Sequence, residues 1–227
     1  MAAKKSLRPP TSPPRAEITV LAGVNGAGKS SIGGAFLREN GAEYFNPDQA
    51  ARAAIAANPS MGQTEANAWA WQEGRRQLEA ALAKGTAFTF ETTLGGTTLT
   101  RLLLEGATQG AIIRIWYAGL ESVELHLRRV AARVDKGGHN IPERDIRQRW
   151  IGSHANLIRL IPHVTSLLVY DNSLDRDPST GTAPLPRLVL SIEEKRLTFP
   201  LADQLSGTPQ WAKPIVLAAY QHFNPYA

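Results

Sequence analysis

The residues Gly23-Val24-Asn25-Gly26-Ala27-Gly28-Lys29-Ser30 match GxxxxGK(S/T), the pattern of a loop that binds the phosphates of a nucleoside triphosphate. The apolar run at 18–22, just before this loop, predicts a short buried strand, and residues 31–39, just after it, predict a helix. Strand, loop and helix in this order form the setting in which the pattern cradles phosphates. The alternative, a glycine-rich turn without a ligand, is disfavoured by the flanking sequence.

The residues of the loop divide by chemical role. Gly23, Gly26 and Gly28 permit backbone conformations that a Cβ would block, so the loop amides can surround a phosphate at the positive end of the following helix. We expect Lys29 to reach the β- and γ-phosphates and the Ser30 hydroxyl to hold the metal. The predicted cofactors are therefore ATP and Mg²⁺. The predicted ATP-binding residues are Gly23, Asn25, Gly26, Ala27, Gly28, Lys29, Ser30 and Ser31.

The composition is that of a globular protein of 227 residues with a formal net charge of +5. The chain has no cysteine, which excludes disulfides and thiolate metal sites and suits the cytoplasm. No apolar run is long enough to span a bilayer, so we expect no membrane association. Residues 1–15 are rich in proline and basic residues and contain no acid, which predicts a disordered arm that could contact a nucleic acid or an acidic partner.

Strands and helices alternate along most of the chain, which predicts an α/β fold of the phosphate-loop kinase type: a mostly parallel sheet with helices on both faces. We expect a single domain at 16–227, ending in a hairpin and a closing helix at 187–223. The expected strands cover 18–22, 43–45, 87–90, 111–117, 164–170, 187–193 and 195–199. The expected helices cover 31–39, 47–57, 64–84, 97–108, 121–135, 143–161 and 208–223, and Trp71, Leu78 and Leu82 share one face of the third.

Polar residues follow several of these strands, at the edge where α/β sheets bind ligands. Asp48 follows the strand at 43–45, which we expect beside the loop strand. Because phosphoryl transfer to an alcohol needs a carboxylate near the hydroxyl, we predict that Asp48 is the general base; its alternative role is to complement the dipole of its own helix. Glu91 is predicted to grip substrate hydroxyls or to orient Mg²⁺ through water, with a capping or ion-paired acid as the alternative. The predicted substrate-binding residues are Asn46, Glu91, Thr92, Thr93, His139 and Asn140.

Basic residues outnumber acids between 126 and 149. Two arginine-bearing helices are expected here around Gly137-Gly138, which permit a tight bend. We predict a lid at about 126–149 whose guanidinium groups stabilise the transferring phosphoryl group. A solvated pair of basic helices is the alternative interpretation.

Four segments together resemble the zeta toxins and their small bacterial homologues. These segments are the phosphate loop, Asn46-Pro47-Asp48, Glu91-Thr92-Thr93, and Gly137-Gly138-His139-Asn140-Ile141-Pro142 followed by Ile146-Arg147. Tyr170-Asp171-Asn172-Ser173 is also similar to the small homologues, and the resemblance covers roughly residues 17–173.

The best-studied members of that family are toxins of toxin–antitoxin pairs. They use ATP and Mg²⁺ to phosphorylate the 3′-hydroxyl of the sugar in UDP-N-acetylglucosamine, which blocks the synthesis of cell-wall precursors. The resemblance implies that Asp48 activates the acceptor hydroxyl and that Glu91 acts on the substrate side. It implies that Arg133 and Arg147 stabilise the γ-phosphate. The predicted catalytic residues are therefore Asp48, Lys29, Arg133 and Arg147, with Arg129, Arg144 and Arg149 competing for the arginine roles.

The sequence therefore predicts an ATP-dependent phosphotransferase with a small-molecule alcohol as acceptor. By resemblance, the acceptor is UDP-N-acetylglucosamine or a related nucleotide sugar, and an antitoxin protein is a partner. The lid segment belongs to the small homologues rather than to the studied toxins, so the acceptor is less firmly indicated than the reaction type. A nucleoside or polynucleotide kinase, favoured by the basic arm, and a nucleotide-dependent binding module without transfer are the alternatives.

Overall fold

Six strands form one sheet in the order β2-β1-β3-β4-β5-β6. The computed structural model describes residues 15–30, 33–34, 43–135, 137–138, 140–175 and 184–223. The strands are β1 (Glu17–Ala22), β2 (Ala87–Thr92), β3 (Ile112–Gly119), β4 (Ser166–Asp171), β5 (Arg187–Glu193) and β6 (Arg196–Phe199). The first four are mutually parallel, and β5 and β6 join antiparallel to β4. The predicted α/β fold with a mostly parallel sheet is confirmed.

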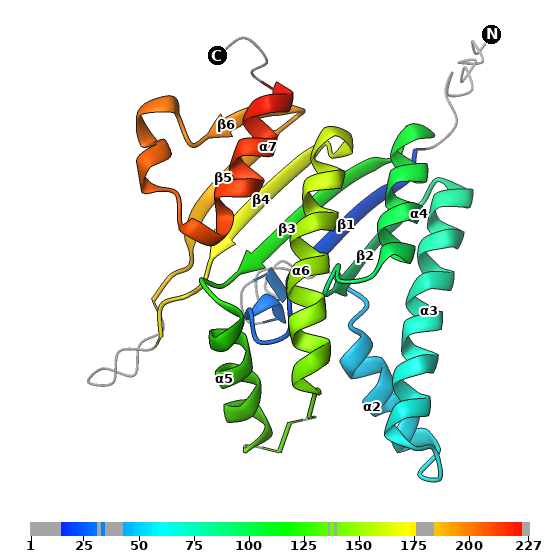
Figure 1. Ribbon diagram of the computed structural model, residues 1–227. Helices are drawn as coiled ribbons and strands as arrows, with labels where there is room; N and C mark the ends of the chain where they lie inside the picture. The colour runs from blue at the N-terminus through cyan, green and yellow to red at the C-terminus, as the bar shows by residue number, and fades with distance from the viewer. Residues whose placement is uncertain are drawn as a thin grey trace, which may run out of the picture.

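Helices flank this sheet. They are α2 (Pro47–Ala57), α3 (Gln63–Lys84), α4 (Thr97–Thr108), α5 (Val123–Val134), α6 (Glu143–Leu160) and α7 (Lys213–Phe223). Three short 3₁₀ turns accompany them: η1 (Ile161–His163), η2 (Ala202–Gly207) and η3 (Gln210–Ala212). Figure 1 shows α3, α4, α6 and α7 side by side over one face, and neighbours in this row are in contact. The first turns of α3 and α6, with α2 and α5, extend past the carboxyl ends of the parallel strands (Figure 1).

The strand expected at 43–45 is a single bridge. Phe45 pairs in parallel with Phe90, at the outer edge of β2, so β2 lies between this segment and β1. The prediction that Asp48 follows the strand beside the loop strand was therefore wrong. The pairing stops at Phe45 because Asn46 already caps α2 and Pro47 has no amide hydrogen to continue a ladder.

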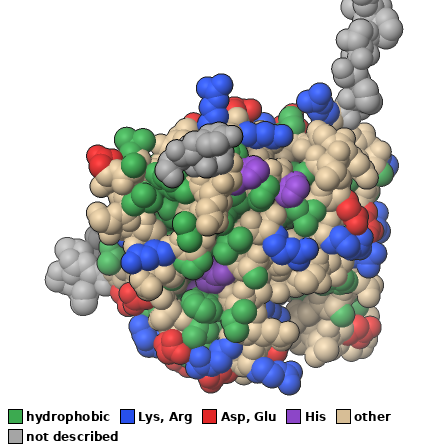
Figure 2. Space-filling view, turned by 45° about the horizontal axis from the view of Figure 1, so that its top comes forward, with side chains coloured by type: hydrophobic (Ala, Val, Ile, Leu, Met, Phe, Trp, Pro, Cys, Tyr) green, Lys and Arg blue, Asp and Glu red, His purple; other side chains and the backbone are tan. Residues whose placement is uncertain are grey.

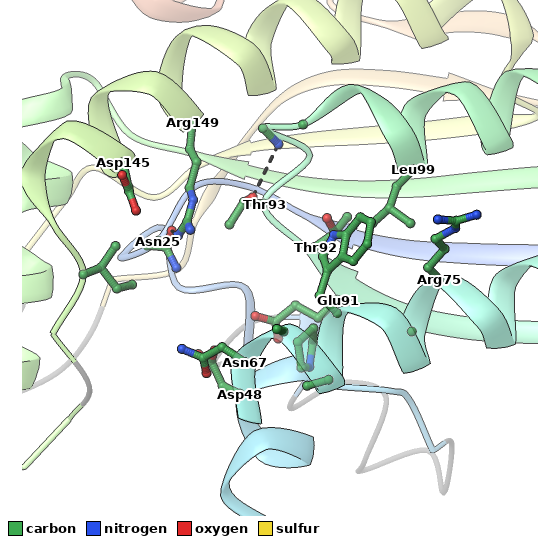
Figure 3. A pocket seen from close by; sticks show the side chains of 18 of the residues that line it. Asn25, Asp48, Asn67, Arg75, Glu91, Thr92, Thr93, Leu99, Asp145 and Arg149 are labelled. Carbon is green, nitrogen blue, oxygen red and sulfur yellow. Dashed lines mark hydrogen bonds between the residues drawn. The ribbon is translucent and has the colours of Figure 1, made fainter. Parts of the chain in front are cut away.

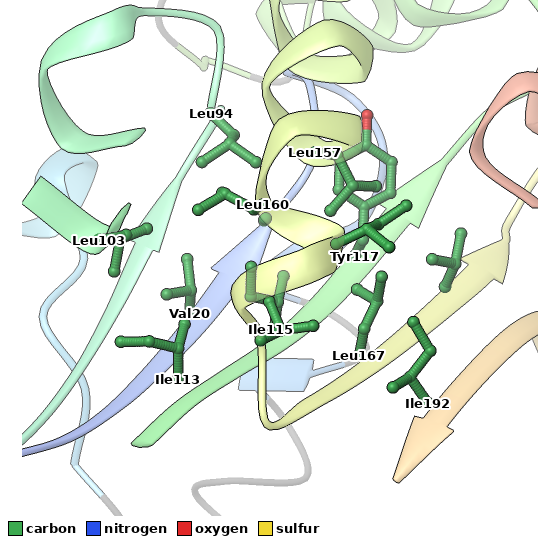
Figure 4. Packing of buried hydrophobic residues seen from close by; sticks show 14 of the residues in the cluster. Val20, Leu94, Leu103, Ile113, Ile115, Tyr117, Leu157, Leu160, Leu167 and Ile192 are labelled. Atoms are coloured by element: carbon green, nitrogen blue, oxygen red, sulfur yellow. The ribbon is translucent and has the colours of Figure 1, made fainter. Parts of the chain in front are cut away.

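The core lies between the sheet and the row of four helices. Figure 4 shows Val20, Ile115 and Leu167 of three neighbouring strands directed toward Leu157 and Leu160 of α6. All five side chains are buried, and burial of each contributes about 1.5–3 kcal/mol to folding. This packing anchors the C-terminal half of α6 and gives the carboxyl ends of the strands a rigid base.

The opposite face of β1 receives the segment that follows the phosphate loop. Leu21 points to this face because side chains alternate along a strand. A Cβ on Gly33 would lie 2.7 Å from Leu21 Cδ2, so the chain passes close to the sheet here. Most of the helix predicted at 31–39 lies outside the described residues.

The C-terminal elements match the predicted hairpin and closing helix. The hairpin turns through Glu194 and Lys195, both with positive φ, and it extends the sheet beyond β4. The closing helix begins later than predicted, at Lys213, because η3 precedes it. In η3, Trp211 packs so closely on Gly119 that a Cβ on this glycine would clash with the indole.

The surface gives two findings on partners. None of the described helices is both long and apolar enough to cross a membrane. On the face shown in Figure 2, Lys and Arg side chains are scattered among acidic and neutral groups and do not form one continuous patch. The predicted basic arm, apart from Arg15, lies outside the described residues.

Candidate active site

The phosphate loop follows β1 and has the predicted backbone geometry. Gly23, Gly26 and Gly28 have φ values of 139°, 84° and 88°, which L side chains rarely adopt. A Cβ on Gly23 would clash with the carbonyl oxygen of Ala118, and one on Gly26 would lie 3.0 Å from that of His126. The glycines therefore give the loop its shape and let it sit close to β3 and α5. Ser31, a predicted ATP-binding residue, lies outside the described residues.

Three separate elements hold this loop from behind. The buried imidazole of His126 donates from Nδ1 to the carbonyl oxygen of Asn25 at 2.8 Å, and burial lowers the pKa of His126 to about 4. Arg149 donates to Oδ1 of Asn25 at 2.9 Å, and the side chain of Asn172 donates to the carbonyl oxygen of Ala27 at 2.9 Å. Helix α5, helix α6 and the segment after β4 therefore preorganise the loop together.

Glu91, at the end of β2, connects the two chemically important loop residues. Its carboxylate lies 3.5 Å from Lys29 Nζ and accepts a hydrogen bond from the Ser30 hydroxyl at 2.8 Å. It also accepts from the side-chain amide of Asn46 at 3.0 Å, while the other end of that amide caps α2 through the backbone N–H of Gln49. Glu91 and Lys29 are both buried, so this ion pair is shielded from water. The ion pair with Lys29 matches the alternative interpretation of Glu91, in which it is an ion-paired acid.

The same residues fit a magnesium ion. Mg²⁺ prefers hard oxygen ligands and usually keeps several waters and substrate phosphates in its coordination sphere. The Ser30 hydroxyl and the Glu91 carboxylate supply such oxygens at the loop. No group of three or more His, Cys, Asp or Glu side chains in the described part of the chain could hold a metal by itself. The donor set therefore suits an ion that arrives with the nucleotide.

The predicted base and one predicted arginine lie close together. Asp48 is in the first turn of α2, half exposed, and its Oδ2 lies 4.0 Å from Nη1 of Arg133 on α5. The backbone amide of Gly138 donates to the carbonyl oxygen of Arg133 at 2.9 Å and closes the end of α5. Two helices far apart in sequence therefore present opposite charges at one edge of the site.

The structure places Arg147 differently from its predicted role. Its guanidinium group pairs with Glu143 at 2.7 Å and Glu124 at 3.0 Å on an exposed surface, and it does not border the cleft described below. Arg149, two positions on, does border it. The backbone of Arg149 packs closely on Gly95, where a Cβ would lie 2.9 Å from Arg149 Cα. The position of Arg149 therefore fits the predicted arginine role of this helix better.

Arg129 and Arg144, the other candidates for the arginine roles, form their contacts within the protein. Arg129 donates to the carbonyl oxygens of Asn172, Ser173 and Leu174 and pairs with Asp175, so it fixes the segment after β4. Arg144 is highly exposed and lies 3.6 Å from its neighbour Asp145.

A cleft of about 900 Å³ opens beside the phosphate loop (Figure 3). It runs from Asn25 and Lys29 past Asp48 and Glu91 to helix α3. Thr92, Thr93 and Asn140 line it, as expected of substrate-binding residues, whereas His139 lies outside the described residues and Asn46 is not part of the lining. The remaining lining includes Phe45, Phe90, Gly96, Leu99, Ile141 and Gln148.

The contribution of α3 to this cleft was not predicted from the sequence. Thr64, Asn67, Trp71 and Arg75 all line it. Trp71 shares a helix face with Leu78 in sequence, yet Leu78 is buried and Trp71 is 44% exposed. The spacing of the four residues shows that they share one face of the helix, but it does not show that this face borders a cleft.

Sheet, loop and cleft define a phosphate-loop nucleotide-binding protein of the α/β class. The AAA domain family (AAA_33) matches residues 18–149, which run from β1 to Arg149. This match spans more than half of the chain, and the protein belongs to that family.

Individual relatives and solved structures match this chain at low sequence identity. An uncharacterized protein of Haemophilus influenzae is 28% identical over 131 residues, which cover 56% of this chain and 88% of that relative. A solved complex of AvrRxo1-ORF1 and -ORF2 with ATP matches with a TM-score of 0.62 and 14% identity over 86% of this chain. The chain spans 64% of the length of that AvrRxo1 chain. The PezAT chromosomal toxin–antitoxin system of Streptococcus pneumoniae matches with a TM-score of 0.52 and 13% identity over 95% of this chain and 87% of that one.

Proposed function

We propose that this protein is an ATP-dependent phosphotransferase that acts on a hydroxyl group of a small molecule. One observation carries the proposal: the half-exposed carboxylate of Asp48 borders the same cleft as Lys29 of the phosphate loop. An acceptor in this cleft can present its hydroxyl to a base and to a γ-phosphate at once. A binding module without transfer has no need for that juxtaposition.

In the proposed reaction, the acceptor oxygen forms a bond to the γ-phosphorus, and the bond from that phosphorus to its bridging oxygen breaks to release ADP. Asp48 takes the proton of the hydroxyl. Lys29 exchanges its ion pair with Glu91 for the phosphates, and Arg149 and Arg133 add positive charge where negative charge spreads over the phosphoryl oxygens. The Ser30 hydroxyl and the Glu91 carboxylate would hold Mg²⁺, which would neutralise part of this charge.

The proposed acceptor is UDP-N-acetylglucosamine or a related nucleotide sugar, and the proposed setting is a toxin of a toxin–antitoxin pair in the cytoplasm. The resemblance to zeta toxins supports both, as does the likeness of fold to the PezAT toxin–antitoxin system. A cleft of about 900 Å³ is in the range of sites that enclose whole small molecules and leaves room for such an acceptor. An antitoxin protein is the partner that follows from this setting.

The test offers the purified protein γ-labelled ATP and Mg²⁺ with a panel of acceptors. The panel contains UDP-N-acetylglucosamine, nucleosides, free sugars and an oligonucleotide. We expect label on the nucleotide sugar and none with Lys29→Ala, while Lys84→Ala, at the exposed end of α3, labels as the parent does. Label on the oligonucleotide end alone would instead identify a polynucleotide kinase. Bound ATP with no labelled acceptor would identify a binding module.

A further inference from the structure

Helix α3 presents a stripe of side chains to the cleft. Thr64, Asn67, Trp71 and Arg75 follow one another at intervals of three or four residues, so they lie on one face, and all four line the cleft. The buried face of the same helix lies directly beside this stripe and is formed by Ala66, Ala70, Gly74, Leu78 and Ala81. The helix is thus fixed by its buried face and free to contact a ligand along the other.

Trp71 contributes the largest apolar side chain of this stripe. Its indole is 44% exposed, although burial of so large an apolar group would favour folding. Trp69, on the same helix, is 45% exposed but does not line the cleft. An exposed indole that faces a cleft can stack on a flat ring of a ligand, and such stacking is largely insensitive to the identity of the ring.

Arg75 supplies the charge in the stripe. Its guanidinium group pairs with Glu79, one turn further along the helix, at 2.9 Å, with both side chains about two-fifths exposed. Exposed pairs of this kind are weak, so an anion in the cleft can replace the glutamate. In Figure 3, Arg75 lies at the end of the cleft away from Arg149, so the two ends each carry an arginine.

The packing of α2 on α3 places Asp48 beside the stripe. Ala51 of α2 packs with Ala66 and Ala70 of α3, and a Cβ on Gly74 would lie 2.7 Å from the ring of Phe45, just before α2. Because Asp48 lies between Phe45 and Ala51 in the chain, it is level with the middle of the stripe.

We propose that the stripe of Trp71 and Arg75 is an acceptor-recognition subsite. It selects acceptors that carry, besides the reacting hydroxyl, a flat ring and an anionic group, phosphate or carboxylate. The subsite rests on the proposed phosphotransferase activity for its role in catalysis. Its ability to bind such a group can be measured without any transfer.

Two matched pairs of variants on α3 test the subsite by kinetics. In labelled transfer to UDP-N-acetylglucosamine, Arg75→Gln and Trp71→Ala each raise KM for the acceptor about tenfold, the scale of one lost stacking or charge-assisted contact. The KM for ATP stays within about twofold of the parent value. Arg76→Gln and Trp69→Ala, at exposed neighbours outside the cleft, leave both KM values unchanged. Glu79→Gln lowers the acceptor KM by about twofold, because it releases Arg75.

A binding measurement separates this proposal from the proposed function. The probe is UDP, titrated calorimetrically into protein saturated with a non-hydrolysable ATP analogue. If no acceptor is phosphorylated but UDP binds and both Arg75→Gln and Trp71→Ala weaken it, the subsite stands and the transfer proposal fails. If both variants bind UDP and turn over acceptor as their matched controls do, the subsite is refuted even where transfer occurs. Absence of UDP binding to the parent protein also refutes it.

Discussion

At the scale of single residues, Asn46 connects the phosphate loop to the proposed base. One end of its amide caps the helix that carries Asp48, and the other donates to Glu91, which in turn contacts Lys29 and Ser30. Because both ends of this buried amide are used within the protein, we interpret Asn46 as a positioning residue. The predicted direct contact of Asn46 with substrate is not supported, because Asn46 does not line the cleft.

Asn46→Asp keeps the capping oxygen and replaces the donor with a second carboxylate facing Glu91. Two carboxylates at one site raise the pKa of one of them, and its proton then restores a donor. We expect phosphoryl transfer about 10²-fold below the parent at pH 8, a general-base scale of loss, with partial recovery as pH falls toward 6. The parent has no such recovery.

The control is Asn58→Asp, the same chemical change at the other end of α2, where the side chain is exposed. It should match the parent at each pH. A profile for Asn46→Asp that parallels the parent at all pH values would contradict the positioning role.

The buried His126 predicts that the unfolding free energy falls as pH falls. Burial lowers its pKa from 6.5 to about 4 in the folded protein, so the folded state resists protonation. The stabilisation from a neutral His126 is complete above about pH 6.5 and is lost as pH falls to about 4; this loss amounts to about 3 kcal/mol. Burial lowers the pKa of His154 in the same direction.

His126→Asn keeps a donor for the Asn25 carbonyl and cannot be protonated. Urea unfolding between pH 7 and 4 should therefore show a smaller loss of unfolding free energy for this variant than for the parent. His163→Asn, at an exposed position, is the control and should retain the parent slope. Equal slopes for His126→Asn and the parent would mean that His126 is not the group responsible.

At the scale of elements, α6 is positioned by close backbone contact. A Cβ on Gly152 would clash with the carbonyl oxygen of Gly95, and Asn156 donates to the carbonyl oxygens of Leu94 and Gly96 at 2.8 and 3.0 Å. Helix α6 therefore sits directly on the loop after β2. This contact sets the position of Arg149 relative to the phosphate loop.

Gly152→Ala should push α6 away from that loop. We expect a loss of about 1–3 kcal/mol in unfolding free energy, as for other overpacked sites. The kcat/KM for transfer should fall by about tenfold or more, because Arg149 moves with the helix. Gly207→Ala, where an added Cβ meets nothing within 4 Å, is the control. Unchanged phosphoryl transfer in a destabilised Gly152→Ala protein would show that the position of α6 does not control transfer.

Helix α6 also shows what could not be predicted from the sequence: which of its arginines meets the cleft. Arg147 and Arg149 are two positions apart and therefore point to different sides of α6. Which side meets the cleft depends on the docking of Gly152 on Gly95, a contact between distant segments that no spacing reveals. The wall formed by α3 was missed for a related reason: a polar helix face has the same pattern whether it borders solvent or a cleft.

At the scale of the whole molecule, local signals predicted most of the architecture. The apolar runs predicted the four parallel strands, and in the structure Asn46 and Gly85, residue types that commonly begin and end helices, cap α2 and α3. The order of strands was beyond these signals, as the bridge at Phe45 shows, because pairing depends on which hydrophobic faces meet. The backbone shape of the phosphate loop was predictable because the positive φ values of Gly23, Gly26 and Gly28 favour glycine.

We propose that this fold brings a base and a phosphate loop to one acceptor cleft. The most direct test measures labelled phosphoryl transfer by the full-length chain and by Asp48→Asn, with Asp203→Asn in the distant turn η2 as control. We predict that Asp48→Asn binds ATP as the parent does and transfers about 10²-fold more slowly or worse, while the control is normal. Near-normal transfer by Asp48→Asn would contradict the account and make Glu91 the next candidate for the base.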